Sequence, residues 1–493
     1  MREAPSLSQT QPAAAEAGPA HLKMRVISGS VWTISGYGAS QVLRLGGNLV
    51  FAKLLFPGAF GLMALVSIFI QGLTMFSDIG IGPSIIQNKR GEDPAFLNTA
   101  WSIQVVRGTL LWAVSALGAA PFAAWYGEPQ LASLIPVAAL AAIISGFTST
   151  KLFSAERNLS LARITVIDFS SQTVGLLSML AWCVVTRSVW AIVFGSLIGT
   201  ATKTVLTHLV LKGERNRFAI ERAAFHELVT FGRWIFISTA LNFFTGQVDR
   251  LMLGKFATMD ELGVYSMAMQ LAQLTPMVAG TLTGGVLFPL LAHHSRTDPQ
   301  AYERALRLAR SMILKGSMFM LGGVALVGPV FFRVLYDPRY ADAGWMAQLL
   351  TVPMWIWMLV MSADRAVLAI GESRMLAVSN AASLAGKFVA CYAGYHYFGL
   401  TGFILGLAVG NLAGHVPIVL ALRRIGIHIL PQDLGYTAAA AACVGGGVLV
   451  QRWASRGLDS NWRSAVELAV AVLVLVPLGW QALKQARLVM ARK

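Results

Sequence analysis

A polar stripe runs along the first long apolar segment of the chain, residues 28–55. Its members lie four, four, three and four residues apart, which places them on one face of a helix; they are Thr33, Tyr37, Gln41, Arg44 and Asn48. A guanidinium in mid-membrane costs about 2.5–3.5 kcal/mol on insertion scales, so Arg44 is expected to face protein or water. It could form a structural pair or snorkel to the membrane surface. The stripe could instead line a wet cavity for an anion, which the rest of the chain favours.

Two further cations in the first half of the chain could join Arg44 in such a cavity, Arg107 and Lys203. A guanidinium binds phosphate oxygens in a bidentate fork and a lysine adds a point charge, so the three residues together predict a site for a diphosphate. The alternative is structural, because Asp78 and Asp168 could neutralise Arg107 and Lys203 within the membrane. The sequence leaves both interpretations open.

Two adjacent acid–base pairs lie near the ends of other apolar segments, Asp249–Arg250 and Asp364–Arg365. Neighbouring residues point about 100° apart on a helix, so neither pair has to satisfy itself. We expect these pairs to form gate or interface salt bridges rather than to bind substrate. An embedded acid could also carry a coupling proton or Na⁺; the candidates are Asp78, Asp168, Asp249 and Asp364.

The composition places all these charges in a membrane protein. The chain has 493 residues, of which 56% are hydrophobic and only 13% charged, whereas about a quarter of the residues in a soluble domain are charged. The net charge of +16 is spread over short loops, which is typical of membrane topology rather than of nucleic-acid binding. The three cysteines have unrelated spacings and predict neither a disulfide framework nor a metal site. No nucleotide-phosphate loop or hydrolase elbow occurs, so we expect no cofactor.

The elements that carry these residues are predicted to be fourteen transmembrane helices. Apolar runs set against turn signals give their limits as 28–55, 60–86, 97–124, 130–150, 163–186, 188–211, 228–254, 263–290, 306–334, 344–370, 374–398, 400–423, 433–452 and 463–483. Lys and Arg concentrate in the loops on the side of the N-terminus, so the positive-inside rule predicts that both termini are cytoplasmic.

The same pattern divides the chain into five parts. They are a disordered cytoplasmic tail (1–24), an N-terminal six-helix lobe (25–212), a cytoplasmic linker helix (213–227), a C-terminal six-helix lobe (228–424), and two additional helices with a basic tail (425–493). The two lobes show a weak internal repeat at an offset of 202 residues, in which Lys53 matches Lys255 and Gly61 matches Gly263. Two repeated lobes with a substrate path between them are common in transporters. The last two spans contain few polar residues and are expected to be an appendage.

Several stretches resemble the bacterial polysaccharide-repeat flippases, the Wzx-like branch of the multidrug/oligosaccharidyl-lipid/polysaccharide exporter superfamily. They are GSVWTISGYGASQVLRLGGNLVFAKLLFPGAFGLMAL (29–65), FSDIGIGPSIIQNKRGED (76–93), FTGQVDRLMLGKFATMDELGVYSMAMQLAQL (244–274), and the stretches 286–310 and 334–350. The likeness extends over about residues 25–425 with the elements in the same order. It implies an all-α fold of two six-helix bundles in a V, with extra helices at the C-terminus.

The resemblance also implies a function. The substrate would be undecaprenyl-diphosphate carrying an oligosaccharide repeat, moved by alternating access from the cytoplasmic to the periplasmic leaflet of the bacterial inner membrane for exopolysaccharide or lipopolysaccharide synthesis. Related lipid flippases hold the diphosphate with cationic cavity residues, for which Arg44, Arg107 and Lys203 are the candidates here. Polar residues of the first and seventh spans could line the glycan: Thr33, Tyr37, Gln41, Asn48, Ser238 and Asn242.

Two other classes of membrane protein fit the sequence less well. A cation-coupled exporter of drugs or small molecules with the same fold would need an apolar and acidic cavity. A membrane glycan polymerase or ligase would carry large periplasmic loops, and the loops here are short. We therefore expect a transporter and not an enzyme, coupled to H⁺ or Na⁺. It is expected to be a monomer in the lipid bilayer, working beside a polysaccharide polymerase or export machinery.

Overall fold

The computed structural model describes residues 19–77, 80–283, 291 and 299–490, and the described chain is helical without a strand. The first half contains α1 (Pro19–Leu54), α2 (Pro57–Phe76), α3 (Ile81–Gln87), α4 (Pro94–Tyr126), α5 (Leu131–Ala138), α6 (Leu140–Gly146), α7 (Lys151–Arg157), α8 (Leu161–Thr186) and α9 (Trp190–Leu209). The second half contains α10 (Arg222–Phe256), α11 (Met259–Ala272), α12 (Leu274–Leu282), α14 (Pro299–Leu335), η2 (Pro338–Tyr340), α15 (Asp342–Ala369), α16 (Ser373–Arg424), α17 (Leu430–Ala440), η3 (Ala441–Gly445), α18 (Gly446–Ala454) and α19 (Ser460–Met490).

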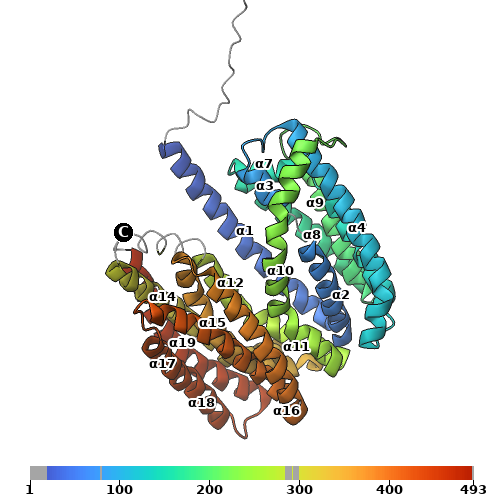
Figure 1. Ribbon diagram of the computed structural model, residues 1–493. Helices are drawn as coiled ribbons and strands as arrows, with labels where there is room; N and C mark the ends of the chain where they lie inside the picture. Colours follow the sequence, from blue (N-terminus) through green and yellow to red (C-terminus); the bar gives the residue numbers. More distant parts are fainter. Residues whose placement is uncertain (1–18, 78–79, 284–290, 292–298, 491–493) are drawn as a thin grey trace, which may run out of the picture.

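The helices form two bundles that are inclined to each other, one from each half of the chain (Figure 1). The bundles meet where α2 packs along α11 and part at the end from which α1 emerges. We call these the closed end and the open end. The long helices α1 and α10 run obliquely between the bundles, and α10 contacts both α2 and α16. The expected all-α fold of two lobes with extra C-terminal helices is therefore observed.

Helices occupy the described part of every predicted span, although several are interrupted. The span 60–86 breaks between α2 and α3, and the spans 374–398 and 400–423 are joined in α16, where Gly399 has a φ of 60°. Within the described residues, nine helices are long and apolar enough to cross a membrane, or ten when the bent pair 131–146 and 151–157 counts as one span. The number fourteen stays a prediction.

The predicted boundary of the N-terminal tail is wrong. Helix α1 begins at Pro19, so residues 19–24, which we expected to be disordered, are helical. Proline is well suited to the first turn of a helix because its missing N–H would have no partner there, and Ala20, Leu22 and Lys23 are good helix formers. Residues 1–18 lie outside the described part of the chain.

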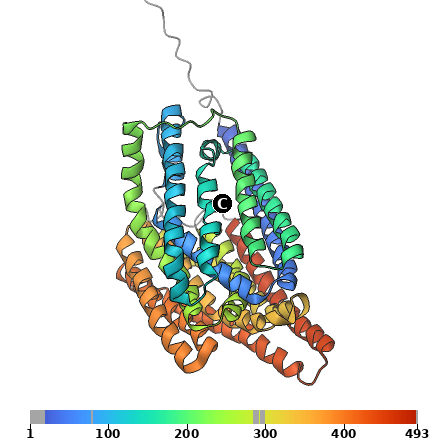
Figure 2. The same cartoon turned by 90° about the vertical axis from the view of Figure 1, so that its right-hand side faces the viewer.

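The predicted linker helix 213–227 is also wrong. Residues 214–221 form no helix, and the helix that follows, from Arg222, is the first part of α10. Side chains of α4 accept hydrogen bonds from the linker's backbone. Ala219 N donates to Ser102 Oγ at 3.1 Å, and Glu221 N donates to Thr99 Oγ1 at 2.9 Å. These bonds replace the internal bonds of a helix. Figure 2 shows the linker crossing the end of α4 at the top of the molecule.

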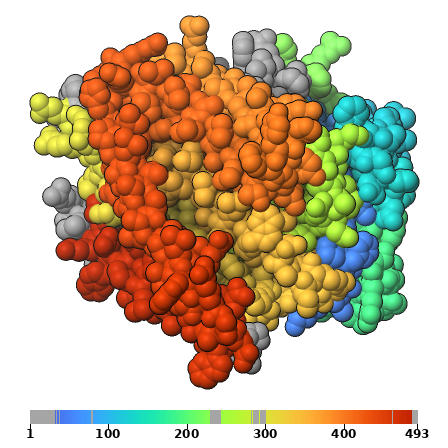
Figure 3. Space-filling model, turned by 90° about the horizontal axis from the view of Figure 1, so that it is seen from below, coloured from blue at the N-terminus to red at the C-terminus, as the bar shows by residue number. Residues whose placement is uncertain are grey.

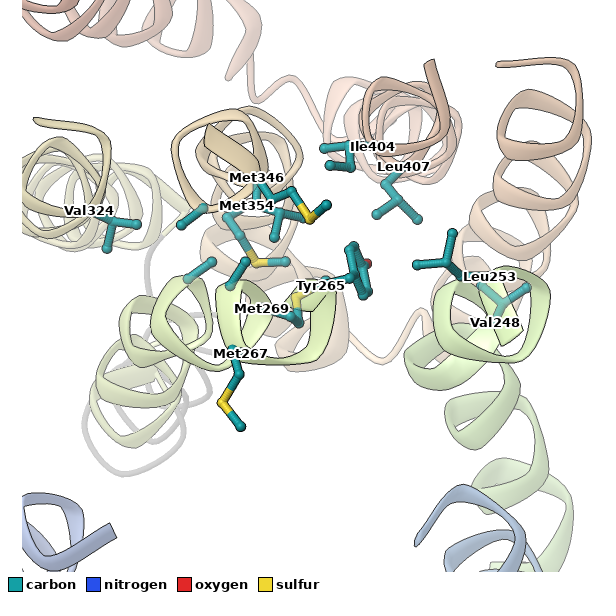
Figure 4. Close-up of a cluster of buried hydrophobic side chains, with 14 of the residues drawn as sticks. Val248, Leu253, Tyr265, Met267, Met269, Val324, Met346, Met354, Ile404 and Leu407 are labelled. Atoms are coloured by element: carbon teal, nitrogen blue, oxygen red, sulfur yellow. The ribbon is translucent and has the colours of Figure 1, made fainter. Parts of the chain in front are cut away.

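Helix α11 is largely buried within the second lobe. A capping box starts it, since Thr258 Oγ1 accepts from Glu261 N and Thr258 N donates to Glu261 Oε2. Its Met, Ala and Gly residues allow α2 and α15 to pack closely against it. Figure 4 shows Tyr265 pointing from α11 toward Leu407 of α16 and Leu253 of α10. Helix α11 therefore packs both in the core of the second lobe and against α2 of the first lobe.

The closed end is held by contacts between the lobes. Gly58 N, in the first turn of α2, donates to Asp260 Oδ1 at 2.6 Å. Tyr340 is fully buried and donates its hydroxyl to Leu55 O at 3.3 Å. Tyr126, at the end of α4, donates its hydroxyl to Leu251 O at 3.1 Å. Opening a path at this end would require all these contacts to separate.

Candidate functional site

Two neighbouring cavities lie where the bundles diverge, and both are lined by Gln273, the residue between α11 and α12. The smaller, of about 120 Å³, lies between α1 and α11–α12 and is lined by Gln41, Arg44, Leu45, Gln270, Gln273, Leu274 and Met277. The larger, of about 430 Å³, lies in the second lobe among α10, α15 and α16. We call them the interlobe cavity and the second-lobe cavity.

The described part of the polar stripe faces the second lobe. Asn48 Nδ2 donates to Gln270 Oε1, and Gln41 Nε2 donates weakly to Met277 Sδ at 3.7 Å. Arg44 lies between them on the same helix face, is exposed, and lines the interlobe cavity. No described side chain or backbone group pairs with its guanidinium. The side chains of Thr33 and Tyr37 lie outside the described residues, as do those of Ser238 and Asn242.

Arg107 fastens the end of α2 and does not line the interlobe cavity. Its Nε donates to Ser77 Oγ at 3.0 Å, and one of its terminal nitrogens donates to Thr74 O at 2.8 Å. These acceptors include an orphan carbonyl of the last turn of α2, so Arg107 acts as a cap for that helix. Its predicted partner Asp78 lies outside the described residues.

Lys203 of α9 pairs with Asp168 of α8, with 2.7 Å between Nζ and Oδ1. Both side chains are more than one-third exposed, and neither lines the interlobe cavity. The predicted neutralisation of Lys203 by Asp168 is therefore observed. The structure does not bring Arg44, Arg107 and Lys203 into one cavity.

The second-lobe cavity gathers two acids and two cations. Asp249 of α10 is buried and accepts from the Tyr265 hydroxyl at 2.7 Å. Lys387 of α16 donates to Thr245 O, one turn from Asp249, at 3.0 Å. Sequence patterns could not predict this contact of Lys387, because it joins residues 142 positions apart and has no local spacing.

Of the predicted pairs Asp249–Arg250 and Asp364–Arg365, only the second contains an ion pair between its own two members. Arg365 Nε lies 3.8 Å from Asp364 Oδ1, which is an ion pair too long to be a hydrogen bond. Arg250 instead donates to Gln247 Oε1 at 3.2 Å, and Gln247 Nε2 donates to Gln71 of the first lobe at 3.0 Å. Arg250 therefore belongs to an interface between the lobes, but one made through amides rather than through a salt bridge.

Sequence reasoning missed a buried charge cluster that attaches the C-terminal helices. Arg310 of α14 is fully buried and donates to Asp433 of α17, whose other carboxylate oxygen lies 2.9 Å from His415 Nε2 of α16. Near the closed end, Glu467 of α19 pairs with Arg333 of α14 at 3.1 Å. The last spans were expected to be a sparsely polar appendage, whereas buried ionic contacts hold them on the second lobe. Asp433, the first residue of the predicted span 433–452, is the one member of the cluster whose position in the sequence could have indicated a buried ionic contact.

Metal and disulfide chemistry have no candidate among the residues that the structure describes. Cys183, Cys391 and Cys443 are separate thiols, and no three His, Cys, Asp or Glu side chains in this part of the chain could hold a metal ion together. The chemistry of the site therefore consists of fixed charges and amide dipoles beside a cavity.

Comparison with known proteins gives a consistent result. A family model described as polysaccharide biosynthesis protein matches residues 50–344. The chain is 24% identical over 276 residues to the lipopolysaccharide biosynthesis protein WzxC of Escherichia coli, with 55% of each chain covered. It is 18% identical over 267 residues to the teichuronic acid biosynthesis protein TuaB of Bacillus subtilis, covering 54% of this chain and 55% of that one. The chain thus spans about half the length of the curated relatives it matches.

The fold has solved counterparts. The structure of the lipid II flippase MurJ in an inward closed conformation superposes with a TM-score of 0.69 and 12% sequence identity, covering 91% of this chain and 98% of that one. At this identity the likeness concerns the fold. Together with the apolar helices described above, it identifies a multi-pass membrane protein with a transporter fold.

Proposed function

This chain belongs to the polysaccharide biosynthesis protein family, and we propose that it is a flippase that moves a lipid-linked oligosaccharide repeat across the membrane. The carrier would be undecaprenyl-diphosphate. The observation that carries the proposal is Arg44, an exposed guanidinium with no described partner at a cavity between two lobes. A cation held at membrane depth without a counter-charge is costly unless an anion or water meets it.

The proposed orientation puts the open end in the cytoplasm of a bacterium, with both termini on that side of the inner membrane. The excess of basic residues at the open end, in loops and in the helix ends beside them, supports this placement, since the cytoplasmic side is rich in Lys and Arg; these residues include Lys89, Arg90, Arg157, Arg215, Arg217, Arg304, Arg307, Arg423 and Arg424. The bundles would then admit substrate from the cytoplasmic leaflet while the closed end excludes the periplasm.

The diphosphate is proposed to bind at Arg44, with Gln41 and Gln273 as neutral hydrogen-bond partners. Guanidinium groups bind phosphate oxygens through two parallel N–H donors, which suits a diphosphate better than a point charge does. Lys203 would contribute only if the ligand displaced Asp168, and Arg107 only if it released the end of α2. Arg44 is therefore proposed as the principal ligand of the three. The sugars would bind to the polar face of α1.

Ion coupling is proposed to use the second-lobe cavity. Asp249 and Lys387 line it together with Asp364 and Arg365, so its formal charges balance when all four residues are ionised. A proton added to either acid would leave the cavity with a positive charge, and charge changes of this kind bias the packing of lobes. Gln273 connects this cavity to the one at Arg44. We propose that one chain works as a monomer, since each chain holds both lobes.

The test is restoration of surface polysaccharide in a bacterial host that lacks its own flippase, at equal membrane abundance of each variant. Arg44→Ala should lower the export rate by about tenfold or more, because a hydrogen bond to a charged group contributes about 1.5–3 kcal/mol. Lipid-linked repeat should accumulate on the cytoplasmic side. Arg44→Lys should retain part of the activity. Val42→Ala, at an exposed position of the same helix, is the matched control.

Two outcomes would contradict the proposal. Export at the wild-type rate by Arg44→Ala would show that the anion binds elsewhere. A wild-type chain that restores no polysaccharide but raises tolerance to cationic drugs would favour the small-molecule exporter.

A further inference from the structure

A third cavity, larger than the interlobe cavity and the second-lobe cavity, lies on another side of the second lobe, away from Arg44. It occupies about 930 Å³ between α14 and α15 on one side and α17, η3 and α18 on the other. Seen from below, the surface is hollowed between the orange-red C-terminal helices and the gold-coloured α14–α15 (Figure 3). Its volume is at the upper end of the range for ligand cavities. We call it the C-terminal pocket.

The outer wall of the pocket is made largely of small residues, which leave space between the wall and α15. The wall includes Ala440, Ala441, Ala442, Gly445 and Gly446, and the π-helical turn η3 (Ala441–Gly445) lies within it. A Cβ on Gly445 or Gly446 would meet no atom within 4 Å. π-Helical turns are rare and frequently mark functional sites.

Polar contacts fix the wall at both of its ends, so it does not collapse onto the lobe. Toward the open end, Trp355 Nε1 donates to Thr437 Oγ1 at 3.0 Å, next to the buried Asp433 cluster. Toward the closed end, Gln451 is buried and donates to Leu326 O at 3.1 Å and to Glu467 O at 2.6 Å. An apolar space held open in this way is unfavourable if it is empty, since its lining atoms lack partners.

The chemistry of the lining suits a hydrocarbon chain with an anionic head. Most of the inner surface is apolar and includes Met318, Leu321, Trp345, Leu349, Val352, Ile356, Val444, Val448 and Leu449. At the closed end the pocket is bordered by Arg452, which is exposed and donates to Gln348 Oε1 at 3.3 Å. The nearby Glu467 is buried and already paired with Arg333 and Arg463. Arg452 is therefore positioned to meet a phosphate at the membrane surface.

We propose that the C-terminal pocket binds a resident anionic phospholipid, with an acyl chain inside the pocket and its phosphate on Arg452. The lipid belongs to the leaflet at the closed end. It fills the gap between the second lobe and its two C-terminal helices, and it is not the transported lipid. The proposal depends on the membrane location of the chain and not on the substrate proposed above.

The experiment measures lipid retained by, and melting temperature of, full-length protein purified in mild detergent. The wild type should retain about one phosphatidylglycerol per chain, detected by native mass spectrometry. After delipidation, added phosphatidylglycerol should raise the melting temperature more than phosphatidylcholine does. Gly446→Leu, which fills the pocket without meeting backbone, should abolish both effects. Gly435→Leu lies on the same span, has open space around it and does not line the pocket, and should behave as wild type.

A second variant separates the head from the tail. Arg452→Gln should leave the acyl chain bound but lower the preference for phosphatidylglycerol over phosphatidylcholine about fivefold, as expected for one cation near an anionic surface. Arg456→Gln, which does not line the pocket, is its control. If Gly446→Leu does not fold, Ala441→Leu tests the same filling.

Three results would overturn the proposal. One is equal lipid retention by wild type and the pocket-filling variant. Another is equal stabilisation of the wild type by both phospholipids. The third is recovery of an isoprenoid phosphate in place of a phospholipid, which would assign the pocket to the transported lipid.

Discussion

Gly61 and Gly263 occupy matching positions in the two halves of the chain and lie against each other at the closed end. A Cβ on Gly61 would stand 2.1 Å from Met259 O and 3.2 Å from Gly263 N, while one on Gly263 would stand 1.9 Å from Pro57 O and 3.2 Å from Gly61 N. Met259 and Pro57 are also separated by the repeat offset of 202 residues. The two lobes therefore close through the same backbone surface on each side, like the subunits of a two-fold dimer.

The first prediction concerns this contact. Gly61→Ala or Gly263→Ala should prevent the closed end from closing, because carbonyl oxygens lie at about 2 Å from the added methyl group. Export should fall by at least about tenfold, and spin labels on α4 and η2 should report a longer distance between the lobes. Gly46→Ala, whose Cβ would meet nothing within 4 Å, is the control. An alanine variant with wild-type distances and export would refute the role of the contact.

Lys203 and Asp168 allow a charge-exchange test. If their pair is structural, then Lys203→Asp combined with Asp168→Lys should restore the export that either change alone reduces. The expected effect of each single change on stability is small, about 1 kcal/mol or less, since both side chains are more than one-third exposed. A double variant that stays inactive while folding normally would instead assign Lys203 to the diphosphate.

Asp249→Asn should separate coupling from binding. The change keeps an acceptor for the Tyr265 hydroxyl but removes the carboxylate charge from the cavity that Lys387 lines. We expect flipping in proteoliposomes to lose its response to an imposed proton or Na⁺ gradient. Tyr265→Phe, which loses one hydrogen bond worth about 1 kcal/mol, should keep the response. An Asp249→Asn protein that still responds to the gradient would place coupling elsewhere.

The buried cluster at Asp433 should contribute strongly to stability. Asp433→Ala leaves the guanidinium of Arg310 buried without its counter-charge, and breaking such a pair typically costs about 3–5 kcal/mol. Thermal unfolding in detergent should show a correspondingly large drop in melting temperature. Glu303→Ala breaks the exposed pair with Arg307 on the same helix α14 and should cost about 1 kcal/mol or less. Equal losses for both variants would contradict this account.

A pH dependence is expected at the start of α4. Arg90 donates to the Asp93 carboxylate at 2.6 Å and, with the bond from Ala95 N, lowers the pKa of Asp93 below its ordinary 3.8. The unfolded chain therefore takes up a proton at a higher pH than the folded one. The stabilisation is complete above the ordinary value and is lost as the pH falls through the lowered pKa.

Asp93→Asn keeps a cap for the helix but removes the charge. Its melting temperature should thus fall less steeply than that of the wild type below about pH 4. Asp93→Ala should lose the cap as well, and about 1 kcal/mol at every pH. Parallel melting curves for wild type and Asp93→Asn would show that this carboxylate does not carry the dependence.

Local sequence patterns predicted the features whose cause is local. The polar stripe of α1 was recognisable because helical spacing alone places Gln41, Arg44 and Asn48 on one face, and the positions of the spans follow from runs of apolar residues. Gly61 and Gly263 could be matched because the repeat preserves their spacing. None of these inferences required knowledge of a distant partner.

The features that sequence reasoning missed depend on partners far along the chain. Arg310 and Asp433 are 123 residues apart, and each alone looks like a residue at the edge of a span. The linker was expected to be helical from its composition, but the hydroxyls of Thr99 and Ser102 compete successfully for its backbone. Arg107 and Lys203, like Arg44, lie within apolar spans of the first half of the chain. That position does not determine the direction in which each side chain points.

The linker of residues 214–221 also affects how the chain folds while it is being synthesised. The first half of a chain is synthesised and begins to fold before the second. The backbone N–H groups of Ala219 and Glu221 are bound to α4. A folded first lobe therefore fixes the place at which α10 starts. Each newly synthesised second lobe would then be inserted from the same starting point. Lengthening the linker would remove this fixed starting point before it affected any contact in the finished protein.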